Sequence, residues 1–99
     1  MLHIVNKSPL ERNAVDSCLR LATKGSAVLL IEDAVYAATK GNAVAAKVQA
    51  AMANLKVYAL APDLEARGLA GRAIEGVNLV DYSGFVDLVA EHNNCQSWL

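Results

Sequence analysis

The segment of residues 26–31 (Ser-Ala-Val-Leu-Leu-Ile) limits the fold more than any other part of the chain, because its apolar residues do not alternate with polar ones. A strand with one face in water usually alternates, whereas a strand covered on both faces does not. Such strands are typical of the interior of a parallel sheet. We therefore expect residues 26–31 to form a buried strand, with helices on both faces of its sheet.

Strand and helix patterns alternate along the rest of the chain. Leu2–Val5, Lys56–Leu60 and residues 77–80 have strand patterns, and the tail, residues 93–99, suits either a fifth short strand or an extended arm. Helical patterns fall between them, at residues 8–24, 34–39, 43–54, 64–67 and 85–91. This order predicts an α/β fold, a three-layer sandwich around a mainly parallel sheet. A chain of 99 residues has room for a single domain, residues 1–99.

Local signals indicate where the helices begin and end. Ser8 and Glu11 have the spacing of a capping box, and Pro9 suits the first position of the helix that follows. Gly25 suits a left-handed residue that stops this helix. Ser83 is a candidate cap for the helix of residues 85–91.

Composition and charge exclude several classes of protein. Hydrophobic residues make up 55% of the chain, so we expect some apolar surface to be buried against other subunits as well as within the fold. The net charge is -1 and no run of Lys or Arg occurs, which argues against direct binding to nucleic acid. No apolar stretch approaches the roughly 20 residues of a membrane span, and the N-terminus lacks the layout of a signal peptide. We expect a cytoplasmic protein.

The functional interpretation depends most on whether Cys18 fills space in the core or takes part in sulfur chemistry. At about 100° per residue it lies near the middle of the apolar half of the first predicted helix. A thiol in apolar surroundings has a raised pKa and reacts slowly, so the position favours a space-filling role. Sulfur chemistry at Cys18 is the alternative, provided that the helix is only partly covered. The helical wheel places these residues on the apolar half: Leu10, Ala14, Val15, Cys18, Leu19, Leu21 and Ala22.

The other cysteine and the two histidines give weaker signals. Cys95 lies in a polar tail and is expected to be exposed, without an assigned role. His3 is expected to be buried and hydrogen-bonded near a strand end, and His92 ends the last predicted helix. Their spacing matches no metal motif, and no glycine-rich phosphate loop follows a strand. We therefore expect neither a metal site nor a cofactor.

Three further features allow two interpretations each. Glu32 and Asp33 follow a buried strand, so they either cap the next helix or line a ligand site at the sheet edge, with capping favoured. Asp63 and Arg67 form either a local ion pair or part of a subunit contact. Trp98, the only tryptophan, either folds back on its own domain or anchors a partner.

Several segments together resemble the DsrH/TusB family, in an order and spacing that cover essentially the whole chain. Each motif is weak alone. The segments that carry the resemblance are Leu2-His3, residues 7–9 (Lys-Ser-Pro), 32–38 (Glu-Asp-Ala-Val-Tyr-Ala-Ala), 56–60 (Lys-Val-Tyr-Ala-Leu), 63–68 (Asp-Leu-Glu-Ala-Arg-Gly), 81–88 (Asp-Tyr-Ser-Gly-Phe-Val-Asp-Leu) and the tail with Trp98.

The resemblance implies a subunit of a persulfide sulfur relay. Such proteins assemble with DsrE- or TusD-like and DsrF- or TusC-like partners into a hexamer of two copies each, which passes sulfur between small sulfur-carrier proteins. The main sulfur-accepting cysteine belongs to the DsrE/TusD-type subunit. One branch of the family serves 2-thiolation of the tRNA wobble uridine, and the other serves dissimilatory sulfur oxidation.

The position of Cys18 directs the choice between the branches. The sulfur-oxidation subunits that this chain resembles carry a cysteine at the matching position, and the tRNA-thiolation subunits tend to lack it. The leading hypothesis is thus a DsrH-like subunit for sulfur oxidation, which we do not expect to be catalytic alone, with Cys18 as a secondary persulfide site. The alternatives are a TusB-like, purely structural subunit, and a small-ligand binder that uses Glu32 and Asp33.

Overall fold

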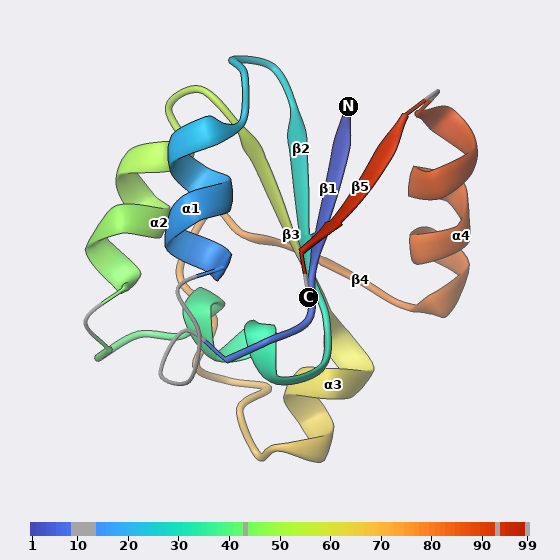
Figure 1. The fold of residues 1–99 in the computed structure, drawn as a ribbon. Coiled ribbons are helices and arrows are strands. Elements are labelled where there is room, and N and C mark those ends of the chain that lie inside the picture. Colours follow the sequence, from blue (N-terminus) through green and yellow to red (C-terminus); the bar gives the residue numbers. More distant parts are fainter. Residues whose placement is uncertain (9–13, 43, 93, 99) are drawn as a thin grey trace.

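Five parallel strands form one sheet in the computed structural model, which describes residues 1–8, 14–42, 44–92 and 94–98 (Figure 1). The order across the sheet is β4-β3-β2-β1-β5, and every neighbouring pair is parallel. The predicted α/β class with a mainly parallel sheet is confirmed. The strands are β1 (Leu2–Val5), β2 (Ala27–Leu30), β3 (Lys56–Leu60), β4 (Asn78–Val80) and β5 (Cys95–Trp98).

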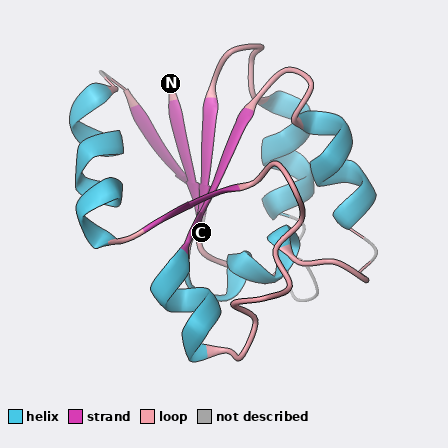
Figure 2. Ribbon diagram, turned by 180° about the vertical axis from the view of Figure 1, so that it is seen from behind, coloured by secondary structure: helices cyan, strands magenta, loops and turns pink. Residues whose placement is uncertain are grey.

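Helices cover both faces of the sheet, as the buried strand requires. On one face lie α1 (Ala14–Leu21), the 3-10 helix η1 (Glu32–Ala38) and α2 (Ala45–Ala51). The opposite face is covered by α4 (Tyr82–Glu91), seen alone on its side of the sheet in Figures 1 and 2. The short α3 (Ala61–Ala66) follows β3 directly and lies below the ends of the strands in Figure 1.

Strand β2 lies in the middle of the sheet and contributes to both cores. Ala27 and Leu29 pack on the side of α4, while Val28 and Leu30 pack on the side of α1 and α2. All four side chains are at most 2% exposed. The absence of alternation at residues 26–31 therefore reflects cover on both faces, as predicted.

Helix α1 ends earlier than the sequence predicts. Gly25 has a φ of +90°, the predicted left-handed conformation, although α1 already ends at Leu21. The predicted cap of α1 falls partly on Pro9 and Glu11, which lie outside the described residues.

The predicted cap of the last helix at Ser83 is wrong. Asp81 caps α4, because its carboxylate accepts a hydrogen bond of 2.8 Å from the backbone N–H of Gly84. The third residue of a helix is where a cap side chain finds a free donor, and Asp81 is spaced for it. Ser83 lies inside the first turn instead.

The tail of the chain forms β5, so the fifth-strand interpretation is confirmed. β5 pairs with β1 in parallel, with Leu2 opposite Cys95 and Val5 opposite Trp98. The N-terminal strand thus lies inside the sheet, between β2 and the last strand of the chain.

Candidate functional site

Cys18 lies in the core between α1 and the sheet. Its side chain is 0% exposed and belongs to the same apolar cluster as Val15, Val28 and Val57. Burial raises the pKa of the Cys18 thiol to about 12. Because a thiolate is the form that attacks sulfur, a thiol held in this position is poorly suited to take up a persulfide.

One residue of the predicted apolar half of α1 is exposed instead. Leu21 is 67% exposed, whereas Val15 and Cys18 are fully buried. Leu21 lies about 120° from Val15 around the helix, so it falls outside the buried arc. The helical wheel predicts a wider buried face than α1 has, and the apolar side chain of Leu21 therefore lies on the surface of the helix.

Cys95, the second cysteine, is an exposed free thiol at the start of β5. The sequence predicted its exposure, and the structure agrees. It occupies the edge strand of the sheet, whereas Cys18 lies in a helix of one covering layer. The two cysteines therefore have very different access to solvent.

Trp98 folds back on its own domain. Its indole N–H donates a hydrogen bond of 3.1 Å to Nδ1 of His3, and its ring packs at the edge of the core that contains Val5. His3 is 4% exposed, and burial, followed by the nearby N-terminal amino group, lowers its pKa. The prediction of a buried, hydrogen-bonded His3 is confirmed.

A charged cluster joins the segments that follow β2 and β3. Nε and Nη2 of Arg67 lie 3.0 and 2.8 Å from Oδ1 of Asp33, and Nη1 donates to the backbone oxygen of Asp63 at 3.1 Å. The hydrogen bonds to Asp33 raise the pKa of Arg67. Capping of η1 by Glu32 or Asp33 is wrong, because neither side chain caps it and Asp33 reaches α3 instead.

The backbone turns sharply at the start of η1. Glu32 has a φ of +50°, which is unusual for a residue with a side chain. Its backbone N–H donates a hydrogen bond of 2.6 Å to Oδ2 of Asp63. Asp63 therefore contacts both the strained residue and Arg67, and the cluster holds η1 against α3.

Loss of the guanidinium of Arg67 should weaken the contact between η1 and α3. We expect Arg67→Ala to lower the free energy of unfolding by about 1.5 kcal/mol, because two hydrogen bonds between charged groups are lost. Urea unfolding followed by circular dichroism measures the loss. Arg72→Ala, at an exposed position, is the matched control and should change stability little. Equal losses of unfolding free energy in the two variants would show that the charged cluster does not stabilise the fold.

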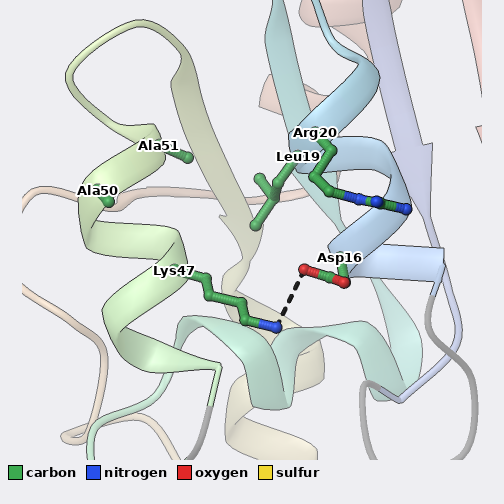
Figure 3. A pocket seen from close by; sticks show the side chains of 6 residues that line it. All are labelled: Asp16, Leu19, Arg20, Lys47, Ala50 and Ala51. Atoms are coloured by element: carbon green, nitrogen blue, oxygen red, sulfur yellow. Dashed lines mark ion pairs between the residues drawn. The ribbon is translucent and has the colours of Figure 1, made fainter.

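A groove runs between α1 and α2 (Figure 3). It has a volume of about 550 Å³, and an ion pair of 3.1 Å between Lys47 and Asp16 spans it from one helix to the other. A second hollow of about 280 Å³ adjoins it and reaches Lys24. No sequence pattern predicts this groove, because it depends on how far apart two helices pack. Its lining residues are Asp16, Leu19, Arg20, Lys47, Ala50 and Ala51.

Within residues 1–8, 14–42, 44–92 and 94–98, no three His, Cys, Asp or Glu side chains gather as metal ligands would. None of the described helices combines the length and the apolar character needed to cross a bilayer.

The fold is shared with solved structures of low sequence identity. The ychN protein from Escherichia coli aligns with a TM-score of 0.81 at 18% identity, covering 97% of both chains. Protein MTH1491 from Methanobacterium thermoautotrophicum aligns with a TM-score of 0.70 at 18% identity, covering 97% of this chain and 95% of that one. At such identity these likenesses establish the architecture alone.

Sequence similarity is much closer to proteins named TusB. Protein TusB of Pectobacterium parmentieri is 37% identical over 98 residues, which is 99% of this chain and 100% of the relative. Protein TusB of Escherichia coli (strain K12 / DH10B) is 39% identical over the same shares. A family model described as DsrH like protein matches residues 7–95. This chain therefore belongs to the DsrH/TusB family.

Proposed function

We propose that this chain is the TusB-like subunit of a sulfur-relay complex that serves 2-thiolation of the tRNA wobble uridine. The observation that carries the proposal is the identity of 37–39% to proteins named TusB along the full length of both chains. These names favour tRNA thiolation over the sulfur-oxidation branch, to which Cys18 had directed the sequence interpretation.

The role of the chain in this relay is structural. Burial raises the pKa of the Cys18 thiol to about 12, so the thiol is protonated at pH 7, and the residue is out of contact with solvent. Uptake of a persulfide at Cys18 stays a prediction that would require α1 to move off the sheet. The proposal therefore assigns the transferred sulfur to a cysteine of a partner subunit.

The partners in this proposal are TusC-like and TusD-like subunits, two copies of each with two of this chain, and small sulfur-carrier proteins that visit the complex. Exposed apolar side chains on one face of α4 suit such an assembly, since isolated domains rarely leave several large apolar residues side by side in water. They are Tyr82, Val86 and Val89.

The test is complementation in a bacterial strain that lacks its own relay subunits. We expect this chain, expressed with its cognate TusC-like and TusD-like subunits, to restore 2-thiouridine in tRNA, as measured by mass spectrometry of nucleosides. The two partners without this chain should not restore it. Unchanged tRNA with all three subunits assembled would contradict the proposal.

The same strain separates a structural role of Cys18 from a chemical one. Cys18→Ala and Cys95→Ala are expected to restore 2-thiouridine as the unmodified chain does. A Cys18→Ala protein that folds and assembles but leaves tRNA without 2-thiouridine would instead assign a persulfide step to Cys18.

A further inference from the structure

Strand β5 lies at the edge of the sheet, where β1 is its one neighbouring strand (Figure 1). Three of its four side chains, those of Cys95, Gln96 and Ser97, are exposed. Trp98 is therefore the one side chain of this strand that is partly buried. Short edge elements with few buried contacts are among the parts of a fold that open most easily.

The contact of Trp98 with His3 depends on the protonation of the imidazole. The two ring centroids lie 6.1 Å apart, and the indole N–H donates to Nδ1 of His3 at 3.1 Å. Nδ1 can accept this hydrogen bond only when the imidazole is neutral and its proton lies on Nε2. The imidazolium carries a proton on each nitrogen, so protonation replaces the hydrogen bond with two N–H groups that point at one another.

The surroundings of His3 do not offset a positive charge on its ring. The amino group of Met1 carries the same sign, and together with burial it lowers the pKa of His3. Strand β2 has no titratable side chain, and the thiol of Cys18 on α1 is protonated. The charged residues of α1, Asp16 and Arg20, line the surface groove beside α2. Among the described residues, no carboxylate lies within ion-pair distance of His3.

We propose that the contact between His3 and Trp98 makes β5 a pH-sensitive strand, which protonation of His3 releases from β1 while the rest of the sheet stays paired. His3 is 4% exposed beside Trp98, so release of β5 is the smallest movement that lets water reach the charged ring. On its other side β1 pairs with the buried strand β2, where no such group titrates.

The direction of the pH dependence follows from linkage. The ordinary pKa of His3 is 6.5, and in the folded chain it is lower. Neutral His3 therefore keeps β5 in place above pH 6.5, and the attachment weakens as the pH falls below 6.5 toward the lowered pKa. In that window the ratio of released to attached β5 rises by up to about 10-fold per pH unit. The inference does not rest on the sulfur relay.

Two backbone amides report separately on the two sides of β1. The N–H of Leu2 donates to the backbone oxygen of Asn94, next to β5, at 3.0 Å. The N–H of Ile31, next to β2, donates to the backbone oxygen of Val5 at 3.0 Å. Exchange of the Leu2 amide with deuterium requires β5 to leave, whereas exchange of the Ile31 amide requires β1 and β2 to separate.

The test is amide exchange of the full chain, measured by NMR from about pH 5 to about pH 7.5. After correction for the intrinsic exchange rate, the protection of Leu2 should fall by up to about 10-fold per pH unit below 6.5. The protection of Ile31 should change far less. In His3→Gln the protection of Leu2 should no longer follow the pH, because the amide side chain can accept from Trp98 and takes up no proton.

His92→Gln is the matched control, since it replaces the other histidine of the chain and should retain the full pH dependence. Equal losses of protection at Leu2 and Ile31 would mean that the whole fold opens, and would overturn the proposal. A His3→Gln protein with the pH dependence of the unmodified chain, or a His92→Gln protein without it, would do the same.

Should His3→Gln fail to fold, Trp98→Phe removes the hydrogen-bond donor instead. The protection of Leu2 should then be lower at pH 7 than in the unmodified chain and should depend less on pH. An unchanged protection and an unchanged pH dependence in Trp98→Phe would also reject the proposal.

Discussion

Leu29→Ala is expected to lower the free energy of unfolding by about 3 kcal/mol. Leu29 is 0% exposed, lies in the central strand β2, and packs with Leu2 and Leu88 between the sheet and α4. Its truncation removes buried methyl groups and leaves a cavity that flanking strands on both sides prevent from collapsing. For a domain of this size the loss is a large fraction of the total stability.

Urea unfolding, followed by the fluorescence of Trp98, measures this effect. The matched control is Leu21→Ala, which removes the same atoms from a side chain that is 67% exposed. We expect the control to change stability by less than about 0.5 kcal/mol. Similar losses for the two variants would mean that the core on the α4 side contributes no more than the surface of α1.

Trp98→Ala is expected to cost about 2.5 kcal/mol and to detach β5 from β1. The substitution removes the half-buried indole, and it also takes the hydrogen-bond donor away from Nδ1 of the buried His3. Trp98→Phe keeps most of the ring and loses the donor, so it should cost about 1 kcal/mol. Thermal unfolding followed by circular dichroism compares the three proteins, and equal stability of all three would contradict the role assigned to Trp98.

The same hydrogen bond gives the stability a defined dependence on pH. Nδ1 can accept from Trp98 only when His3 is neutral, and burial lowers its pKa below the ordinary value of 6.5. Between the two pKa values the unfolded chain binds a proton that the folded chain does not. The contribution of His3 is therefore present above pH 6.5 and is lost as the pH falls toward its lowered pKa.

His3→Gln separates this contribution from other titrations. In that window a single histidine changes the unfolding free energy by at most about 1.4 kcal/mol per pH unit. The unmodified chain should lose stability more steeply than His3→Gln as the pH is lowered through 6.5. If the unfolding free energies of the two proteins fell in parallel as the pH was lowered, His3 would not contribute to the pH dependence of stability.

The sequence predicted most of the sheet, because each strand has its own local pattern. Residues 26–31 show no alternation, and this property follows directly from cover on both faces. The exact helix ends were harder to predict. Asp81 and Ser83 are both common capping residues, and only the position of the first helical residue decides between them.

Contacts between distant segments were predicted least well. Asp33 and Arg67 are 34 residues apart, and the sequence assigned both of them local roles. The predicted local ion pair of Arg67 with Asp63 is present at 4.0 Å, but the shorter contact of Arg67 with Asp33 was not predicted. The sequence does contain a pattern that could have predicted this contact. Asp33 follows β2 and Arg67 follows β3, and two neighbouring parallel strands end at the same edge of a sheet. The α1–α2 groove had no such signal, because its width depends on the packing of small residues such as Ala50 and Ala51.

The position of β1 between β2 and β5 has a consequence for synthesis of the protein. Chains emerge from the ribosome starting at the N-terminus, and pairings between distant residues form slowly. Leu2 can pair with β2 early, but its other neighbour, Cys95, is made 93 residues after it. Until Cys95–Trp98 has been made, the nascent chain therefore presents an open, apolar strand edge to which another nascent chain can add.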